Sequence, residues 1–241
     1  MTMGPPTNLL GAMGLLALLA GPPAGGTVPR AGTASTPARG PGRILAEPPA
    51  KPDSGATYLF YLHGRIVQEQ GRGAVSPKYG PYEYDAIPKG LAEAGLVVIS
   101  EPRPRGTEPS AYAGRVAGQV ERLLEAGVPA RRITIVGASM GGFIAMLVSN
   151  RLAAREIGYV FMGSCDEETL ELGSGLHGEV LSIFEASDEL EQSCARLFAR
   201  ASDVGRHAEV RIDTGLHHGF LYRPLSEWMG PVIRWARARD A

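Results

Sequence analysis

The most informative segment of the chain is a β-branched run that leads straight into a glycine-rich turn. It reads Ile133-Thr134-Ile135-Val136-Gly137-Ala138-Ser139-Met140-Gly141-Gly142. The β-branched part is typical of a buried strand, and the apolar residues after the serine predict a helix that begins at once. Glycines two residues before and two residues after the serine leave room for a sharp turn, because a Cβ there would collide with neighbouring backbone. We therefore expect Ser139 to sit in a strained backbone conformation above a sheet.

The chain after residue 57 alternates short apolar runs with longer segments of helical periodicity. This is the pattern of βα units that build a mostly parallel sheet. Residues 113–124 carry apolar side chains at helical spacing on one face, and Gly127 ends that helix. The stretch 139–152 is apolar almost all round, which predicts a central helix packed deep against the sheet. Strands are expected at 57–62, 96–100, 132–137, 159–163, 180–184 and 209–213.

The strand, the Gly-x-Ser-x-Gly turn and the helix together resemble the nucleophile turn of the α/β-hydrolase superfamily. The resemblance implies a single-domain α/β fold with a mostly parallel sheet of about six strands and helices on both faces. Within the superfamily the chain is similar to small dienelactone-hydrolase-like and esterase-like serine hydrolases. Ser139 would be the nucleophile, and the Met140 N–H at the helix N-terminus would stabilise an oxyanion. Too few residues lie between the strands ending at Gly163 and beginning at Val180 to form a cap domain.

Two other interpretations of the turn are weaker. A Gly-Ala-Ser-x-Gly turn also begins the short-chain dehydrogenase fold, but here the turn follows the third expected strand instead of the first. Gly142 lies one residue too early for that fingerprint, no acidic residue closes a second strand, and Tyr-x-x-x-Lys is absent from the sequence. The second alternative is a glycine-rich turn in which the serine has no chemical role.

A serine hydroxyl needs a general base, and histidine suits this role because its pKa lies near neutral pH. In the superfamily that histidine follows the last strand. Of the five histidines, only His217 and His218 lie in such a loop, within the segment 215–220. The ending His-Gly-Phe resembles the catalytic loop of dienelactone-hydrolase-like and peptidase-like members, so we expect His218 to be the base. His217 is the fallback, and a surface histidine pair without a role is the remaining alternative.

The acid that orients the histidine usually follows the penultimate strand. Asp188 lies there, after the run 180–184 and the sequence Glu-Ala-Ser. Asp166, at the end of the preceding strand, is the alternative, because some members take the acid from that place. A lesser alternative is that Asp188 is only the N-cap of a helix over 189–200.

A second oxyanion donor is expected near the start of the domain. Leu62-His63-Gly64-Arg65 ends the first strong strand and resembles the His-Gly element that supplies this donor in the superfamily. The Arg65 N–H is therefore the expected donor. We interpret His63 as a structural residue that orders the loop, because it precedes the nucleophile in the chain.

Composition excludes several classes of partner. The 241 residues carry 24 basic and 25 acidic side chains, a formal net charge of −1, and no long run of either sign. Nucleic-acid binding is therefore not expected. Hydrophobic residues make up 44% of the chain, enough for one substantial core. The chemistry inferred here requires neither a metal nor an organic cofactor.

The N-terminal part differs from the rest. Residues 8–20 form an apolar run that resembles an export signal, and a Pro- and Gly-rich linker continues to residue 56. We expect export, with 57–241 as the hydrolase domain. The apolar run is short for a membrane span and no cysteine follows it to accept a lipid, so a stable anchor is not expected. Because no Lys or Arg precedes Arg30 and no Ala-x-Ala site stands out, a disordered extension or a misassigned start is the alternative.

The chain has two cysteines, Cys165 and Cys194, which are too few for a disulfide scaffold. One bridge and two buried free thiols are equally plausible from the sequence.

These features predict a serine hydrolase that cleaves a small ester or thioester through an acyl-enzyme. A peptidase or amidase of the same fold and a non-catalytic binding module are the alternatives. Tyr79, Tyr82, Tyr84 and the segment 220–222 are expected either to line the acyl pocket or only to pack the loops. The Arg65 side chain either pairs with an acidic substrate or points to solvent. The sequence does not predict the oligomeric state.

Overall fold

The computed structural model describes Met1 and residues 42–154, 156–190 and 193–239. The chain divides into two units, Met1–Pro37 and Ala38–Ala241. The expected export signal and most of the expected linker lie outside the described residues. The sheet, its helices and the candidate site belong to the second unit.

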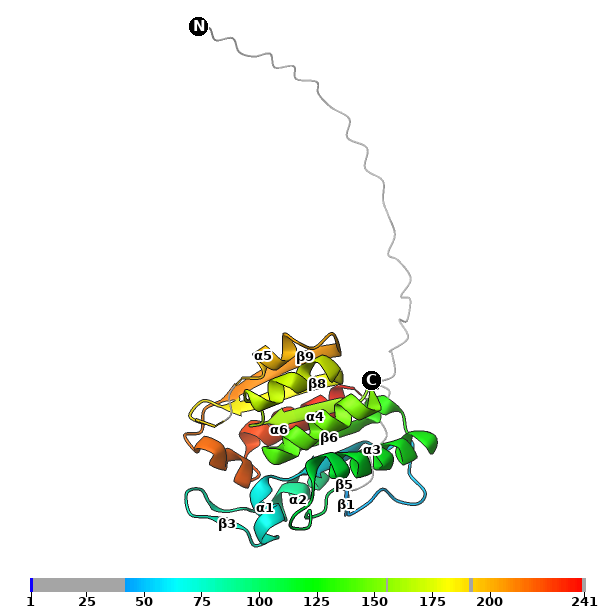
Figure 1. The fold of residues 1–241 in the computed structure, drawn as a ribbon. Helices are drawn as coiled ribbons and strands as arrows, with labels where there is room; N and C mark the ends of the chain where they lie inside the picture. Colours follow the sequence, from blue (N-terminus) through cyan, green and yellow to red (C-terminus); the bar gives the residue numbers. More distant parts are fainter. Residues whose placement is uncertain (2–41, 155, 191–192, 240–241) are drawn as a thin grey trace, which may run out of the picture. The chain divides into compact units, whose positions relative to one another are not determined.

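A seven-stranded sheet forms the centre of the fold, and every neighbouring pair of its described strands is parallel (Figure 1). Strands with apolar side chains on both faces are typical of such a sheet, because helices cover both sides. In spatial order the strands are β1 (Arg43–Leu45), β5 (Val97–Ile99), β2 (Tyr58–Leu62), β6 (Ile133–Ala138), β7 (Gly158–Met162), β8 (His177–Glu185) and β9 (Asp203–Ile212).

All six predicted strands are present. The sheet also has a seventh strand, β1, which we did not predict from the sequence. Strand β1 pairs with β5 in the register Arg43 to Val97. It is only three residues long and exposes two of them, so it carries no hydrophobic pattern of its own. The sheet therefore begins before residue 57, within the segment expected to be linker.

Helices cover both faces of the sheet, as predicted. Figure 1 shows α3 and α4 in front of the sheet and α6 behind it. The helices are α1 (Arg65–Gln70), α2 (Ala86–Glu93), α3 (Pro109–Glu125), α4 (Met140–Leu152), α5 (Ala195–Phe198) and α6 (Ser226–Ala238), with the 3-10 helices η1 (Ala130–Arg132), η2 (Glu168–Gly175) and η3 (His217–Tyr222).

Successive strand residues point to opposite faces and so supply two separate cores. In β2, Tyr58 and Phe60 pack with α3, α4 and α5 on one side. Leu59 and Tyr61 pack with α2 and α6 on the other side. Helix α4 is buried along most of its length, which confirms the deep central helix predicted from its uniformly apolar sequence.

The loops that could form a site gather at the carboxyl ends of the parallel strands, where ligands bind in open α/β sheets. The connection from β7 to β8 holds only η2 and short turns among the described residues, so no cap domain is inserted there. A two-stranded hairpin of β3 (Val75–Ser76) and β4 (Gly80–Pro81) lies between α1 and α2 in the chain. No helix in the described part of the chain has the length and apolar character needed to cross a bilayer.

Candidate active site

Ser139 occupies the strained turn that the sequence predicts. It follows β6 directly, precedes the first residue of α4, and has φ 51° and ψ −121°. A Cβ at Gly137 would lie 2.2 Å from the carbonyl oxygen of Gly141, and a Cβ at Gly141 would lie 1.9 Å from that of Leu62. Only glycine fits at both positions, so the flanking glycines allow the backbone to hold Ser139 at a positive φ.

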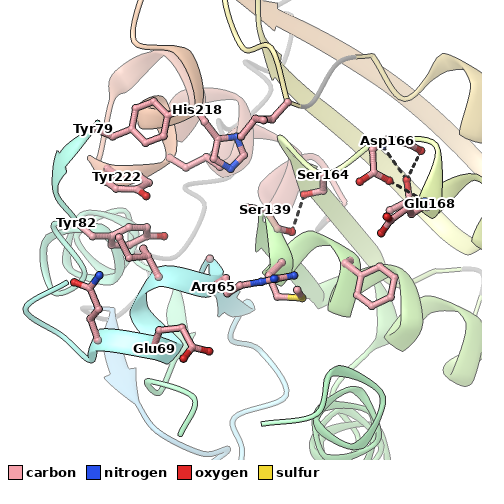
Figure 2. A pocket seen from close by; sticks show the side chains of 18 residues that line it. Arg65, Glu69, Tyr79, Tyr82, Ser139, Ser164, Asp166, Glu168, His218 and Tyr222 are labelled. Atoms are coloured by element: carbon pink, nitrogen blue, oxygen red, sulfur yellow. Dashed lines mark hydrogen bonds between the residues drawn. The ribbon is translucent and has the colours of Figure 1, made fainter. Parts of the chain in front are cut away.

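A neighbouring serine supports this turn from β7. The hydroxyl of Ser164 donates to the carbonyl oxygens of Ser139, at 3.1 Å, and of Met162, at 2.8 Å (Figure 2). The Ser139 N–H also donates to the Met162 oxygen at 2.8 Å. A Cβ at Gly142 would lie 1.9 Å from the Ser164 hydroxyl, so this glycine allows the approach. No pattern in the sequence marks Ser164 beyond its position directly after a predicted strand.

His218 and Asp188 are hydrogen-bonded to each other. Nδ1 of His218 lies 2.7 Å from Oδ2 of Asp188, and the two side chains are 10% and 1% exposed. The other carboxylate oxygen of Asp188 accepts the Leu190 N–H at 3.1 Å. Figure 2 shows the imidazole of His218 pointing into the cavity that Ser139 lines, and both residues line the same cavity. The structure thus brings together the three residues expected from their order along the chain.

The fallback residues have other partners. His217 uses Nδ1 to bond the Ser187 carbonyl oxygen at 2.6 Å, and it does not line the cavity. Asp166 lines the cavity, but its carboxylate accepts the N–H of Thr169, a residue near the start of η2, at 2.9 Å. The helix expected over 189–200 is only α5, which begins at Ala195. Asp188 is therefore not its N-cap.

Two helix N-termini converge beside Ser139. Arg65 is the first residue of α1 and Met140 the first of α4, so neither N–H has an acceptor within its own helix. A Cβ at Gly64 would lie 3.7 Å from the Cβ of Ser139, which places the start of α1 against the serine. Gly64, Arg65 and Met140 all line the cavity. Both expected oxyanion donors are thus at the site.

His63 is a buried, neutral structural residue. Burial, followed by the nearby Arg103 charge, lowers the pKa of His63 to about 3. Its Nδ1–H donates to the Gly64 oxygen at 2.8 Å, and its Nε2 accepts the Arg103 N–H at 2.8 Å. This network orders the loop that carries Arg65, as the sequence interpretation of His63 expects.

Arg103 completes that network and was missed by sequence reasoning. Its side chain is 2% exposed, and its Nη2 donates to the carbonyl oxygens of His63, at 2.5 Å, and Gly64, at 3.4 Å. Its Nε donates to Gln68 on α1 at 3.1 Å. Burial lowers the pKa of Arg103, and no carboxylate pairs with it within the described ranges. The guanidinium of Arg103 thus bonds backbone carbonyl oxygens and not a carboxylate. These bonds fix the backbone directly before Arg65.

The cavity has a volume of about 630 Å³ and one tyrosine-rich wall. The ring centroids of Tyr79 and Tyr222 lie 5.6 Å apart, and those of Tyr82 and Tyr222 lie 4.8 Å apart. Tyr79 also contacts His218, with ring centroids 6.3 Å apart. Figure 2 shows these three tyrosines on the same side of the cavity as His218.

Two expected lining residues lie elsewhere. Tyr84 is buried, bonds Ser100 through its hydroxyl at 2.9 Å and packs edge-on against His63. It therefore stabilises the loop and does not line the cavity. Phe220 is fully buried in the core, while its neighbours Leu221 and Tyr222 line the cavity.

Four charged side chains also line the cavity, beside apolar residues such as Ile66 and Phe143. Asp166 and Glu168 lie across from the tyrosine wall, and Arg65 and Glu69 lie below Ser139 in Figure 2. The exposed Arg65 side chain is thus accompanied by three carboxylates. Within the residues described, no group of three His, Cys, Asp or Glu side chains is arranged to hold a metal ion.

Comparison with solved structures identifies the fold of the chain. No protein-family model matches the sequence, and no curated protein matches it. Among solved structures, Arabidopsis thaliana SOBER1 aligns with a TM-score of 0.53 at 11% identity, over 77% of this chain and 100% of the other. The Paleococcus ferrophilus monoacylglycerol lipase aligns with a TM-score of 0.52 at 12% identity, over 76% and 94%. The chain has the α/β-hydrolase fold. At these identities the α/β-hydrolase likeness concerns the fold alone.

A disulfide joins two loops on the carboxyl edge of this α/β-hydrolase fold. Cys165 follows β7, next to Ser164 and Asp166, and its Cα lies 5.2 Å from that of Cys194 at the start of α5. Of the two alternatives left open by the sequence, the structure has the bridge. It anchors the loop that carries one wall of the cavity.

Proposed function

We propose that this protein is a serine hydrolase that cleaves a small ester or thioester through an acyl-enzyme on Ser139. The observation that carries the proposal is the buried hydrogen bond between Asp188 and His218 at the cavity that Ser139 lines. A carboxylate that fixes Nδ1–H of a histidine leaves Nε2 as the basic nitrogen, as the general base of a serine hydrolase requires.

In the first step the Ser139 hydroxyl oxygen attacks the carbonyl carbon while Nε2 of His218 takes its proton. Asp188 stabilises the resulting imidazolium. The carbonyl oxygen becomes negatively charged, and the N–H groups of Arg65 and Met140 stabilise it at the ends of α1 and α4.

The tetrahedral intermediate then breaks down as the bond to the leaving group is cleaved. His218 returns its proton to the departing alcohol or thiol, and the acyl group remains on Ser139. Water next gives a proton to the same nitrogen and attacks the acyl-enzyme. Breakdown of the second intermediate releases the acid and restores the serine hydroxyl.

The cavity favours small, uncharged substrates. Its tyrosine wall offers flat apolar surface with hydroxyl groups at the edges, which suits a compact acyl or alcohol group. Glu69 pairs with Arg105 at 3.2 Å, and the carboxylates of Asp166 and Glu168 outnumber the single Arg65 charge, so the cavity would repel an anionic substrate.

We further propose that the protein is exported. The apolar run 8–20 and a disulfide between Cys165 and Cys194 support this, because disulfides persist mainly in oxidising compartments. Sequencing the N-terminus of the mature protein from cell fractions tests it: cleavage after the apolar run supports export, and an intact N-terminus in the cytosol contradicts it.

Hydrolysis of p-nitrophenyl esters of increasing acyl length tests the proposed chemistry. The wild-type protein should release nitrophenolate, and Ser139→Ala should abolish release, whereas the control Ser202→Ala on the exposed surface should retain it. Equal release by Ser139→Ala would refute the proposal. Faster turnover of p-nitroanilides than of the matched esters would instead favour an amidase.

A further inference from the structure

Glu185 is a buried carboxylate that the mechanism above does not use. It is the last residue of β8, lies three residues before Asp188 in the chain, and is 1% exposed. Within the described part of the chain no basic side chain forms an ion pair with it. A buried charge without a counter-ion is costly unless hydrogen bonds replace its hydration.

Its two carboxylate oxygens are divided between two loops. We name residues 186–190 the acid loop and residues 213–218 the histidine loop. In the acid loop, Ser187 donates its N–H at 2.7 Å and its hydroxyl at 2.5 Å to Oε2. In the histidine loop, Thr214 and Gly215 donate their N–H groups to Oε1 at 2.8 and 3.1 Å. Burial alone would raise the pKa of Glu185, but these hydrogen bonds outweigh it and lower the pKa, so the group is a carboxylate.

Two further contacts continue this connection toward the cavity. The backbone N–H of His217 donates to the Ser187 hydroxyl at 3.2 Å, and its Nδ1 bonds the Ser187 oxygen at 2.6 Å. His217 has a φ of 51°, a costly conformation for a residue other than glycine unless its surroundings hold it. The residues that follow Ser187 and His217 in the chain are Asp188 and His218, which bond each other.

We infer that Glu185 is a positioning residue that couples the acid loop to the histidine loop, so that Asp188 and His218 meet in the geometry that activates Ser139. The inference rests on the proposed function for its catalytic consequence, but the coupling itself is structural. Both loops lie outside regular secondary structure for most of their length, so these hydrogen bonds replace the packing that a helix or strand would supply. A misplacement of about 1 Å at a reacting group can cost on the order of 100-fold in rate.

Two variants separate hydrogen-bond geometry from charge. Glu185→Gln keeps the size but places an NH₂ group against N–H donors, so one loop loses its acceptor. Glu185→Asp keeps the charge but is one methylene too short to reach both loops. Glu209→Gln is the matched control, because Glu209 likewise accepts a serine hydroxyl at 2.5 Å and a backbone N–H at 2.7 Å, from Ser193 and Cys194, away from the cavity.

The experiment measures amide hydrogen exchange over 213–219 and the rate constant for labelling Ser139 with a fluorophosphonate, on folded protein checked by thermal melting. Both Glu185 variants should exchange faster in the histidine loop and be labelled about 10–100-fold more slowly, while KM for an ester stays within about twofold of the wild-type value. Glu209→Gln should match the wild type in every readout.

Each contrary result has a distinct meaning. Unchanged exchange and labelling in Glu185→Gln would overturn the inference, and full activity in Glu185→Asp would reduce the role of Glu185 to its charge and also overturn it. A lower melting temperature with unchanged labelling would make the residue merely structural. If the loop exchanges faster in the variants but wild-type Ser139 is never labelled, the coupling stands and the proposed function fails.

Discussion

Different interactions hold the nucleophile turn and the two loops that carry Asp188 and His218: close backbone packing at the turn, and hydrogen bonds to carboxylates in the loops. At the turn, Gly137 and Gly141 permit contacts so close that no other residue fits, and Ser139 is fixed by backbone packing. In the acid and histidine loops, carboxylates at Glu185 and Asp188 hold the backbone and the imidazole through hydrogen bonds. The turn therefore tolerates almost no change of side-chain volume, whereas the two loops depend on the oxygens of a few carboxylates.

The largest expected effect lies in the hydrogen-bonded half. Asp188→Asn preserves the volume but presents NH₂ or a neutral oxygen to His218, which favours the wrong tautomer. We expect kcat to fall by about 10⁴-fold with little change in melting temperature. Ester hydrolysis measured beside Asp166→Asn checks this, because Asp166 lines the cavity without bonding His218. A greater loss in Asp166→Asn would reverse the assignment of the acid.

The next effect concerns the loop that carries Arg65. Arg103→Met removes the guanidinium that bonds the carbonyl oxygens of His63 and Gly64 while keeping an apolar stem in its place. The Arg65 N–H should lose its fixed position, and the loss of one oxyanion donor costs about 10²–10³ in kcat. Steady-state kinetics should show this loss in kcat with a smaller change in KM. A change in KM alone would place Arg103 in substrate binding instead.

A change of volume tests the sterically fixed half. In Gly141→Ala the new methyl group would lie 1.9 Å from the Leu62 oxygen, so the backbone of β2 or α4 must shift. We expect the free energy of unfolding to fall by about 1–3 kcal/mol, as for other overpacked sites, together with a loss of activity. Urea denaturation measures it. Gly118→Ala is the control, because its Cβ would meet no atom within 4 Å.

The last prediction concerns the pH dependence that His63 contributes to the free energy of unfolding. Its pKa in the folded protein is about 3, whereas an unfolded histidine titrates at 6.5, so the unfolded chain binds the extra proton first. The contribution to stability is complete above pH 6.5 and is lost as the pH falls toward 3, at about 1.4 kcal/mol per pH unit. Urea denaturation of wild type and His63→Gln between pH 4 and 7 should show a shallower slope in the variant. Equal slopes would contradict a neutral His63.

The nucleophile turn was predictable because its strand, glycines and helix are consecutive in the sequence. Asp188 and His218 were predictable from the order of the strands along the chain. The ten residues 133–142 contain the strand, the glycines and the start of the helix, so the turn could be predicted without knowledge of distant contacts or loop geometry. Asp188 and His218 were expected from their places after successive strands, and the structure brings them together at the cavity. Their catalytic roles remain a proposal.

Other residues could not be predicted because their partners lie far along the chain. Arg103 bonds His63, forty positions away, and Glu185 bonds Thr214, 29 positions away, in addition to the nearby Ser187, so no local pattern reveals that either one joins two segments. Strand β1 is too short and exposed to show a pattern. Tyr84 was expected to be a candidate lining residue, yet its hydroxyl bonds Ser100, a residue sixteen positions away that no local pattern connects with it.

Mass spectrometry of the fluorophosphonate adduct in the wild type and in His218→Gln tests whether His218 activates Ser139. We expect a single adduct on Ser139 in the wild type and its near-complete loss in the variant, since the hydroxyl has no base without His218. An adduct on another residue, or labelling of Ser139 at the same rate in both proteins, would disprove this role of His218.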